Sequence, residues 1–543
     1  MAGAEKSEVL DVAIVGGGVS GVYCGWRLKT EGKEAKKLRV AVFEESDRIG
    51  GRLLSAEPPG LPRMRAELGG MRILDTQKRV SRLVDKLDIA LYPFPVDDPQ
   101  NIALLRGVHL RLADFTTHPD RVPYRLGFQE HGKSAGQILI DAIERILPGI
   151  TKLSPEERLE AVETATFDGK PLYRQGFWQV LVRVISNEAY DLSVQAGGYQ
   201  STLTSWNAAD AIPWFLADFG VDAKYFGFRK GIQSIPLALA KKFEKAGGTI
   251  ERGRRLLSFD RTRGGKKGGG EGDLLTLRFA DGSKVDARKL ILAMPRRALE
   301  LLEPKGPVLG RDNGAVRALI GSVTPRPLFK LFTVYEAPWW LSAGVERGRT
   351  VTDLPVRQTY YWPNGDGSPR TTGPAMLMAT YDDGDNIGFW DAFRPRRSRV
   401  REVGGRRAIE LASNLTVYRG PGDPCDDPKT ASKLRDWCDH VAPAEMVAEI
   451  QRQLALIHGL PYVPAPTTAA FKDWGADPYG GGWNSWNIGV RSWEIEKEIL
   501  QPVPDVPVYI CGEAYSRAQG WVEGALDTAD QVLAKLGVAP LVE

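Results

Sequence analysis

A glycine pattern near the start of the chain has the spacing that brings a backbone close to a phosphate group. Gly16, Gly18 and Gly21 form the sequence Gly-x-Gly-x-x-Gly, with Ser20 between the last two. Glycine permits a tight turn and a close approach of backbone N–H groups, and a helix that begins there adds a partial positive charge. Glu44 lies 23 residues after Gly21, where a carboxylate can accept hydrogen bonds from both hydroxyls of a ribose. The pattern therefore predicts a bound dinucleotide, either NAD or FAD.

The elements around this pattern are those that a dinucleotide site needs. Residues 9–15 form an apolar run of strand type, residues 22–29 have the pattern of a helix, and residues 38–43 predict a second buried strand. This order predicts that the chain opens with a β-α-β unit.

Two later blocks have patterns that can extend the same sheet. We predict a helix over residues 232–247, strands over 249–259, 274–279 and 289–293, an exposed Gly-rich hairpin tip over 263–273, a strand over 508–511 and a last helix over 521–536. The inserts between these blocks differ in pattern: residues 134–225 are mainly helical, 325–381 predict aromatic-rich strands, and 401–458 predict two or three helices. Nucleotide-binding pieces at both ends and in the middle imply a discontinuous domain interrupted by two others.

The composition indicates a globular enzyme without a strong charge bias. Lys and Arg total 72 and Asp and Glu total 68, for a net charge of +4, and 43% of the residues are hydrophobic. The sequence has no basic stripe of the kind that binds nucleic acid. It also has no run of 18 or more apolar residues of the kind that spans a membrane. The first residues lack the apolar core of a signal peptide, so we expect a cytoplasmic protein. The oligomeric state stays open, with a homodimer as one alternative.

The cysteines and histidines do not have the spacing of a metal site. Cys24, Cys425, Cys438 and Cys511 are scattered without a Cys-x-x-Cys pair, and the five histidines show neither His-x-His nor His-Glu-x-x-His spacing. We therefore expect neither a disulfide framework nor a bound metal ion.

Three segments carry a resemblance to a known family. Residues 40–52, which end in Arg48-Ile49-Gly50-Gly51-Arg52, resemble the signature of the flavin-containing amine oxidoreductases. Residues 67–72, Glu-Leu-Gly-Gly-Met-Arg, are similar to the family segment that runs beside the flavin ring, and Gly512-Glu513 with Gly520-Trp521 is similar to its C-terminal flavin motif. The family includes monoamine, polyamine and L-amino acid oxidases.

The resemblance implies an α/β fold with a discontinuous Rossmann-like FAD-binding domain, a mixed-sheet substrate domain and a helical insertion domain. The implied FAD-binding parts are residues 8–72, 228–324 and 479–543, the substrate-binding parts are 73–125 and 325–478, and the helical domain is 126–227.

The same resemblance assigns residues to FAD. Glu44 would hold the ribose, Arg52 the pyrophosphate region, and Glu513 the ribityl or phosphate side. The helix that begins near Gly520 would direct its positive end at the flavin region where negative charge develops on reduction. No cysteine stands within the C-terminal motif, so we expect noncovalent FAD. The assigned cofactor residues are Gly16, Gly18, Ser20, Gly21, Glu44, Glu45, Gly51, Arg52, Gly69, Gly70, Met71, Arg72, Leu256, Gly512, Glu513, Gly520, Trp521 and Val522.

The Gly-Met-Arg ending of the second segment is closest to the L-amino acid oxidases, where the arginine binds the substrate carboxylate. Here that residue is Arg72, since a guanidinium matches a carboxylate with two parallel hydrogen bonds. Tyr381 resembles the tyrosine that donates a second hydrogen bond to the carboxylate and forms an aromatic pair with Trp521. Lys330 lies where the family has a lysine that reaches flavin N5 through water. Arg72, Tyr381, Lys330 and Trp521 are therefore the predicted catalytic residues, and Arg72, Tyr381, Gly520, Trp521, Arg326 and Asp383 the predicted substrate-binding residues.

These assignments predict oxidative deamination of an L-α-amino acid. Hydride transfer from Cα to flavin N5 and reoxidation by O2 would yield a 2-oxo acid, ammonia and hydrogen peroxide. The side chain of the substrate stays open: Asp383 suits a basic tail, whereas Trp206, Trp214, Trp362, Trp483 and Trp486 suit a large apolar one.

Three alternatives remain. The chain could be an amine or polyamine oxidase, a monooxygenase that decarboxylates an amino acid to an amide, or a flavin-binding protein without turnover. The segment 473–493, with the glycines of 480–482, has no counterpart in the motifs above and could shape the entrance of the pocket.

Overall fold

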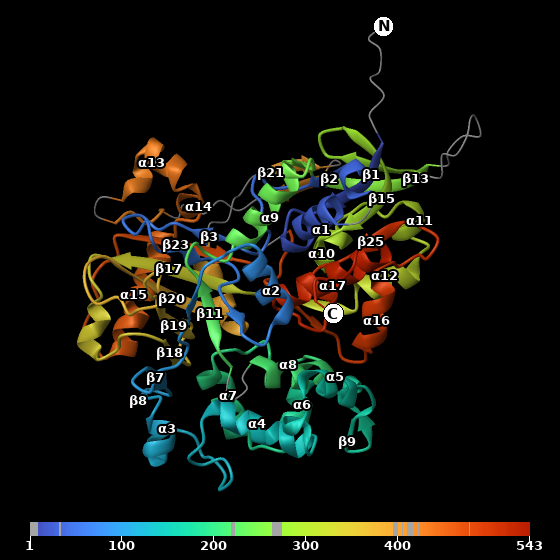
Figure 1. Cartoon of the computed structure of the whole chain (residues 1–543). Helices are drawn as coiled ribbons and strands as arrows, with labels where there is room; N and C mark the ends of the chain where they lie inside the picture. The colour runs from blue at the N-terminus through green and yellow to red at the C-terminus, as the bar shows by residue number, and fades with distance from the viewer. Residues whose placement is uncertain are drawn as a thin grey trace, which may run out of the picture.

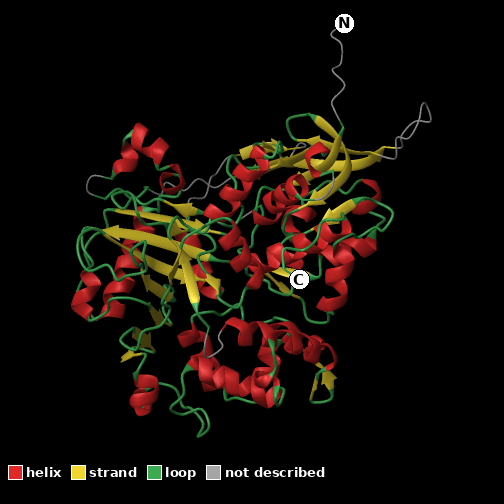
Figure 2. Cartoon of the chain, viewed as in Figure 1, coloured by secondary structure: helices red, strands yellow, loops and turns green. Residues whose placement is uncertain are grey.

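The computed structural model describes residues 9–31, 34–218, 223–262, 274–394, 400–403, 406–409, 416–420, 423–476 and 478–542. The predicted hairpin tip over 263–273 lies outside them. Two groups of strands and a set of helices make up the molecule (Figure 2).

The first sheet has seven strands in the order β12-β2-β1-β15-β14-β13, with β25 paired to β15. Strand β1 (Leu10–Val15), helix α1 (Val19–Thr30) and strand β2 (Val40–Phe43) form the predicted β-α-β unit, with β1 and β2 parallel. The other strands are β12 (Thr249–Glu251), β13 (Leu256–Thr262), β14 (Leu274–Phe279), β15 (Lys284–Leu292) and β25 (Val508–Ile510). Strands β12, β2, β1, the end of β15 and β25 run parallel, as the α/β prediction requires.

The single strand predicted over residues 249–259 is wrong, because the structure has two strands there. Gly253 has a φ of +71°, a conformation that L side chains rarely adopt. The backbone turns at this glycine, so β12 pairs with β2 while β13 pairs with β14.

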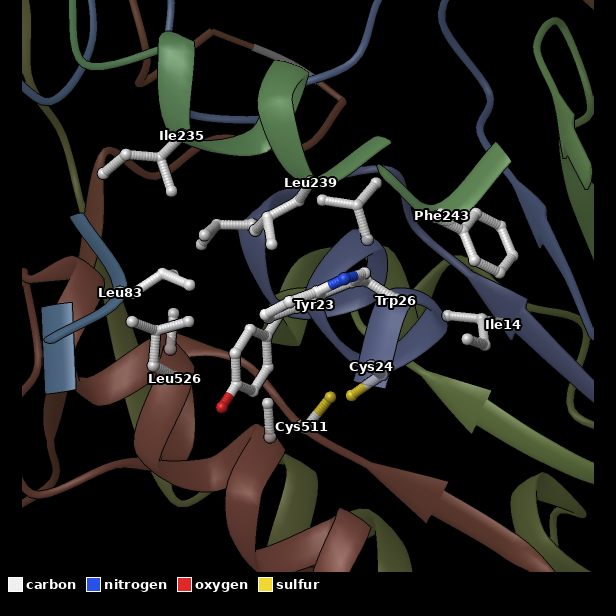
Figure 3. Packing of buried hydrophobic residues seen from close by; sticks show 14 of the residues in the cluster. Ile14, Tyr23, Cys24, Trp26, Leu83, Ile235, Leu239, Phe243, Cys511 and Leu526 are labelled. Carbon is white, nitrogen blue, oxygen red and sulfur yellow. The ribbon is translucent and has the colours of Figure 1, made fainter. Parts of the chain in front are cut away.

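Helix α1 is buried between two other helices and strands β1 and β2 of the sheet. It packs against α9 (Ser234–Lys245) and α17 (Val522–Lys535), and α2 (Lys78–Lys86) contacts α17. Figure 3 shows the shared core, in which Tyr23 and Trp26 of α1 lie among Leu83, Leu239 and Leu526. The core fixes the helix whose first turn belongs to the glycine pattern.

The second sheet is mixed and also has seven strands. Its order is β23 (Thr468–Asp473), β17 (Phe329–Tyr335), β20 (Ala375–Asp382), β19 (Gln358–Tyr361), β18 (Arg349–Thr352), β7 (Ile102–Leu105) and β8 (Val108–Arg111). Only β18 and β7 run parallel among these pairs. Helix α15 (Ala444–His458) packs on this sheet, as its contacts with β7 and β20 show (Figure 1). The predicted aromatic-rich strands are confirmed.

The helices predicted over residues 134–225 are confirmed and lie at the bottom of the view in Figure 1. This insert contains α4 (Ala135–Ile146), α5 (Pro155–Thr164), α6 (Phe177–Leu181), α7 (Asn187–Gly197) and α8 (Ala208–Asp218). Ser134 and Ser154 cap α4 and α5 through reciprocal side-chain bonds with the third helical residue, which satisfies N–H groups that would otherwise lack partners.

The remaining elements connect these units. A three-stranded sheet joins β5 (Ile73–Leu74), β11 (Tyr225–Phe228) and β6 (Leu91–Pro93). Shorter pieces are β3 (Ser55–Ala56), β4 (Ala66–Glu67), β9 (Thr166–Phe167), β10 (Lys170–Pro171), β16 (Val323–Arg326), β21 (Val400–Val403), β22 (Arg406–Ile409), β24 (Trp483–Trp486), α3 (Asp114–Thr117), α10 (Arg296–Glu300), α11 (Gly306–Leu309), α12 (Gly314–Ile320), α13 (Pro428–Lys433), α14 (Arg435–Cys438) and α16 (Ser492–Ile499). Helices α13, α14 and α15 confirm the helices predicted over 401–458.

The cysteines do not all stay free. Cys425 and Cys438 form a disulfide across 13 residues, so this pair is cross-linked although the spacing indicated no disulfide framework. The chain between them folds back through α13 and α14, which the spacing alone did not indicate. Cys24 and Cys511 are free and buried, and their sulfur atoms point toward each other (Figure 3).

Within the part of the chain that the structure describes, no helix has the length and apolar character needed to cross a bilayer.

Candidate active site

A cavity of about 740 Å³ runs from the glycine pattern to the second sheet. Its lining includes Val15 of β1, Phe43 of β2, Trp214 of α8, Lys330 of β17 and Tyr381 of β20. A long cavity with walls from both sheets and from the helical insert can hold an extended cofactor at one end and a small substrate at the other.

The three glycines of the pattern serve different purposes. Gly16 has a φ of +112°, and a Cβ there would lie 2.3 Å from the Ala293 carbonyl oxygen. A Cβ on Gly21 would lie 1.9 Å from the Gly16 carbonyl oxygen, whereas a Cβ on Gly18 would meet nothing closer than 4.0 Å. Gly16 and Gly21 therefore permit the turn and its close packing. Gly18 lines the cavity and leaves there the space that a side chain would fill.

Glu44 stands at the end of β2, where the spacing predicted it. Its carboxylate accepts hydrogen bonds from Gly17 N at 2.6 Å and from Ser46 N and Oγ at 2.9 and 2.7 Å. These bonds hold the carboxylate in place at the cavity wall. Ser20, Glu45, Gly51 and Leu256 line the same part of the cavity, whereas Gly21 is absent from its lining.

Arg52 and Glu513 meet in the middle of the cavity wall. Arg52 Nη1 lies 2.7 Å from Glu513 Oε2, and Asn484 donates to Glu513 through N and Nδ2, both at 2.9 Å. Gly520 N donates to Glu513 Oε1 at 2.8 Å. Because its oxygens accept these four bonds, Glu513 orders Arg52 and the turn at Gly520.

The C-terminal motif delivers a helix end to the cavity. Gly520 has a φ of +83°, and Trp521 is the extended residue before α17. Gly512, Glu513, Gly520, Trp521 and Val522 all line the cavity. The N-terminus of a helix carries a partial positive charge, so this wall suits a group that becomes negative.

Lys330 is an almost completely buried lysine, with 1% of its surface exposed. Its Nζ donates to the carbonyl oxygens of Glu67 at 3.1 Å and Gly69 at 2.5 Å, and it lies 4.8 Å from the centre of the Tyr381 ring. Burial lowers the pKa of Lys330 to about 7, against the opposing attraction of Glu67. The amine can therefore gain or lose a proton near neutral pH.

Arg72 is held among tyrosines. Its guanidinium donates to Tyr199 Oη at 3.1 Å and to Tyr360 Oη at 3.4 Å, and lies 4.1 Å from the centre of the Tyr225 ring. Only 6% of its surface is exposed. Among the described residues, no carboxylate forms an ion pair with it. Asp218 attracts the guanidinium without a direct ion pair. Because a buried cation is costly unless it is paired, the site favours an anionic ligand that binds Arg72 directly.

Tyr381 lies on β20, in register with Lys330 on β17. Its ring contacts Tyr199 edge-on at 5.6 Å and Tyr360 at 6.4 Å. Burial raises the pKa of Tyr381, so its hydroxyl stays protonated. Trp521 lines the same cavity, but among the ring contacts of the described residues it is not paired with Tyr381.

Two predicted substrate residues differ from expectation. Arg326 is absent from the cavity lining, because its side chain donates to Ser485 Oγ at 2.7 Å and to the Ser205 carbonyl oxygen at 3.0 Å. Asp383 lines the cavity but lies beyond the end of β20. It accepts bonds from Gln200 N at 2.9 Å and Ser201 Oγ at 2.5 Å.

The sequence prediction missed several lining residues of the helical insert. Tyr199 follows α7, and Asp218 ends α8. Burial raises the pKa of Asp218 to about 6, against the attraction of Arg72. Neither residue belongs to a motif, so no local signal could have identified it.

The tryptophans divide between cavity and core. Trp214 and Trp483 line the cavity and stack at 6.2 Å with an interplanar angle of 15°. Trp206 contacts both rings edge-on, whereas Trp362 and Trp486 are buried in two hydrophobic clusters.

One wall of the cavity is formed by Asp473, Trp474, Ala476 and residues 479–483, which supports the prediction that this segment shapes the pocket. Trp474 Nε1 donates to the Leu68 carbonyl oxygen at 2.7 Å, and Tyr479 Oη donates to Glu45. A Cβ on Gly482 would lie 2.4 Å from Leu328 Cβ, so a glycine lets this wall pack closely.

The cavity fits FAD. Gly18 and Gly512 line it and would have room for a Cβ, with no atom closer than 4.0 Å. The open space beside these glycines, the fixed carboxylate of Glu44 and the end of α17 are the features that a nucleotide and a flavin ring need. Among the described residues, no group of His, Cys, Asp and Glu side chains could hold a metal ion.

Comparison with known proteins agrees with this geometry. A family model described as flavin containing amine oxidoreductase matches residues 19–403 and 432–533. Aplysianin-A of Aplysia kurodai is 26% identical, over 97% of this chain and 90% of its own. Achacin of Lissachatina fulica is 25% identical, over 98% and 94%.

Two further likenesses extend the comparison. The L-amino acid oxidase Bs29 of Bothriechis schlegelii is 24% identical over 70% of each chain. A solved structure of putrescine oxidase bound to putrescine has a TM-score of 0.65 at 16% identity, and the match covers 97% of this chain and 99% of the other; this likeness concerns the fold. The chain belongs to the family of flavin containing amine oxidoreductases and is an FAD-dependent oxidoreductase.

Proposed function

We propose that this protein oxidises an L-α-amino acid to a 2-oxo acid, with release of ammonia and hydrogen peroxide. The observation that carries the proposal is Arg72, a buried guanidinium in the wall of the cofactor cavity that forms no ion pair with a carboxylate of the described chain. The carboxylate of an amino acid supplies an anion that can pair directly with this guanidinium. A plain amine does not.

The residues of the cavity have different roles in this reaction. Arg72 binds the substrate carboxylate through paired hydrogen bonds, and the Tyr381 hydroxyl donates to the same group. Lys330 holds or releases a proton at its Nζ, beside the Tyr381 ring. Together they orient the substrate so that one Cα–H faces a fixed direction. Glu44, Arg52, Gly18 and the N-terminal end of α17 would hold FAD, which supplies the hydride acceptor and the reactivity toward O2.

The substrate side chain has two classes of candidate. Trp214 and Trp483 line the cavity as a stacked pair, which favours a large apolar side chain. The buried carboxylates of Asp218 and Asp383 also line it, which favours a basic one. The same two carboxylates support the second candidate function, oxidation of an amine or polyamine.

We infer that FAD is bound without a covalent link. Cys511 is buried beside Cys24 and is absent from the cavity lining. Acid precipitation of the holoprotein is expected to leave the flavin in the supernatant. Yellow colour retained in the precipitate contradicts the inference.

The deciding experiment is anaerobic mixing of the holoprotein with a panel of L-amino acids, their D-enantiomers and amines. Bleaching of the oxidised flavin absorbance by L-amino acids is the expected result. Peroxide, ammonia and 2-oxo acid are then measured in air. Carbon dioxide and an amide as products indicate a monooxygenase, and persistent yellow colour with every compound indicates binding without turnover.

Arg72→Ala separates amino acid oxidation from amine oxidation. The variant is expected to lose bleaching by amino acids, because Arg72 is the guanidinium that offers paired hydrogen bonds to the carboxylate, whereas the Nζ of Lys330 already donates to two backbone carbonyl oxygens. If the wild-type protein bleaches with amines and Arg72→Ala retains that activity, the amine oxidase alternative is correct.

A further inference from the structure

Lys330 and Glu67 are two buried ionisable residues at the part of the cavity where the substrate would bind. Lys330 lines the cavity with 1% of its surface exposed, and Glu67 at the end of β4 lies behind it with 3% exposed. A buried charge without a partner is unfavourable. The protonation states of these two groups are therefore linked.

The Nζ of Lys330 uses two of its bonding directions for hydrogen bonds to the backbone. The third direction is left for a group in the cavity. Two N–H groups donate to the carbonyl oxygens of Glu67 and Gly69, at 3.1 and 2.5 Å. An ammonium has three N–H donors, whereas a neutral amine has two donors and a lone pair. The third position of Nζ is thus a donor when Lys330 is charged and an acceptor when it is neutral.

Glu67 is held in place by two donors that leave its charge variable. Ile232 N donates to Oε1 at 2.8 Å and Ser55 Oγ donates to Oε2 at 2.6 Å. When Glu67 is protonated on Oε2, Oε1 can still accept from Ile232 N, and the Ser55 hydroxyl can accept a hydrogen instead of donating one. The two bonds thus favour the ionised form without excluding the protonated form.

Few charged groups act on this pair. Glu67 and Arg72 act on Lys330, and Lys330 and Arg65 act on Glu67, with the phenols of Tyr92 and Tyr381 beside them. Glu67 is the carboxylate that favours the charged lysine, and Arg72 opposes it.

We propose that Glu67 is a positioning residue that sets the protonation state of Lys330, so that the pair holds one proton in common. With the proton on Glu67, Lys330 presents a lone pair to the cavity; with the proton on Lys330, it presents a donor. The net charge is the same in both forms, because the form with a charged lysine also has a negative Glu67. The lysine can therefore change its role without a change in the net charge of the buried pair. The part that this change plays in turnover rests on the proposed amino acid oxidation.

The acidities of the two groups support this sharing. Burial raises the pKa of Glu67 to about 8 and lowers that of Lys330 to about 7. Because the two groups also attract each other, their proton losses belong to the pair rather than to either residue.

The first test is a pH titration of the oxidised flavin absorbance in the substrate-free holoprotein. An inflection near pH 7 is expected, and its loss in Lys330→Met assigns it to the lysine. Glu67→Gln keeps the side-chain shape and removes the negative charge, so the inflection is expected about one pH unit lower or more. Ser55→Ala removes a bond that favours ionised Glu67 and is expected to shift the inflection in the same direction by less.

The second test needs no flavin. The folded-state pKa of Glu67 lies above its ordinary value of 4.5, so the folded apoprotein binds more protons than the unfolded chain between about pH 4.5 and 8. The contribution of Glu67 to the free energy of unfolding is therefore present at low pH and lost as the pH rises toward 8. Glu67→Gln is expected to remove that contribution from the pH dependence.

An inflection that stays in place in both Glu67→Gln and Ser55→Ala, with wild-type FAD content, overturns the inference. If the inflection shifts as expected but no amino acid reduces the flavin, the proposed function fails while the link between Glu67 and Lys330 stands. The two proposals can thus fail separately.

Discussion

Under the proposed function, substrate choice depends on Arg72, because its hydrogen bonds go to phenols rather than to a carboxylate. Lysine keeps the positive charge but cannot form two parallel bonds with a carboxylate. Arg72→Lys is therefore expected to lower kcat/KM for the best amino acid roughly tenfold or more, the equivalent of one charged hydrogen bond. Stopped-flow measurement of flavin reduction over a range of substrate concentrations gives this change in kcat/KM.

Arg326 offers the matched control. The same Arg→Lys change there affects a side chain bound to Ser485 and Ser205, outside the cavity lining. Arg326→Lys is expected to leave kcat/KM within about twofold, since this substitution touches no group of the site. Equal losses in both variants contradict the role given to Arg72.

The glycine pattern gives a second contrast between single residues. A Cβ on Gly21 would collide with the Gly16 carbonyl at 1.9 Å, whereas one on Gly18 would enter the cavity. Gly21→Ala is expected to destabilise the apoprotein by about 3 kcal/mol, and Gly18→Ala by less than about 0.5 kcal/mol. Gly18→Ala should instead weaken FAD binding.

Chemical unfolding of the apoprotein and fluorescence titration with FAD distinguish these effects. A strongly unfolded Gly18→Ala variant, or a Gly21→Ala variant as stable as the wild type, contradicts the assignment.

At the scale of the element, the turn before α17 depends on Glu513. This carboxylate joins Arg52, Asn484 and Gly520, residues of three separate segments. Glu513→Gln removes the charge that strengthens these bonds, so the free energy of unfolding is expected to fall by about 2 kcal/mol. Urea unfolding measures it.

The control removes a carboxylate from an exposed ion pair. Glu156 pairs with Lys78 at the surface, with side chains 67% and 71% exposed, and such pairs contribute little. Glu156→Gln is expected to change the free energy of unfolding by less than about 0.5 kcal/mol. A Glu513→Gln variant as stable as this control would show that the turn does not need the charge.

Elements with strong local patterns could be predicted from the sequence. The β-α-β unit, the amphipathic α9 and the last helix follow directly from apolar spacing and glycine position. The break between β12 and β13 depends on a single glycine with positive φ in an otherwise strand-like run, and a periodicity argument does not detect it. Motif residues such as Glu44, Arg72 and Lys330 were identified because they lie in local sequence signatures.

The rest of the site depends on tertiary contacts. Tyr199, Tyr225 and Tyr360 surround Arg72 from residues up to 288 positions away, and no local pattern marks them. The side chain of Arg326 was misplaced for the same reason, since Ser485 on the neighbouring strand decides where it points.

At the scale of the whole molecule, the cysteines bear on the compartment in which the protein resides. A cytoplasmic location remains a proposal, and the Cys425–Cys438 disulfide weighs against it because disulfides persist in oxidising compartments. Alkylation of the unfolded chain without reductant is expected to modify Cys24 and Cys511, and reduction to expose Cys425 and Cys438 as well. Mass spectrometry of the protein from its native source counts the alkylated cysteines before and after reduction. Four modified cysteines before reduction contradict the cross-link.

The tyrosines around Arg72 come from three parts of the chain that are far apart in the sequence and meet in the folded molecule: the segment after α7, β11 and β19. A chain in which these parts have not come together lacks the pocket that surrounds the guanidinium. Under the proposed function, peroxide production would therefore begin only after the three parts have assembled, and a partly folded chain would not expose the cell to this oxidant.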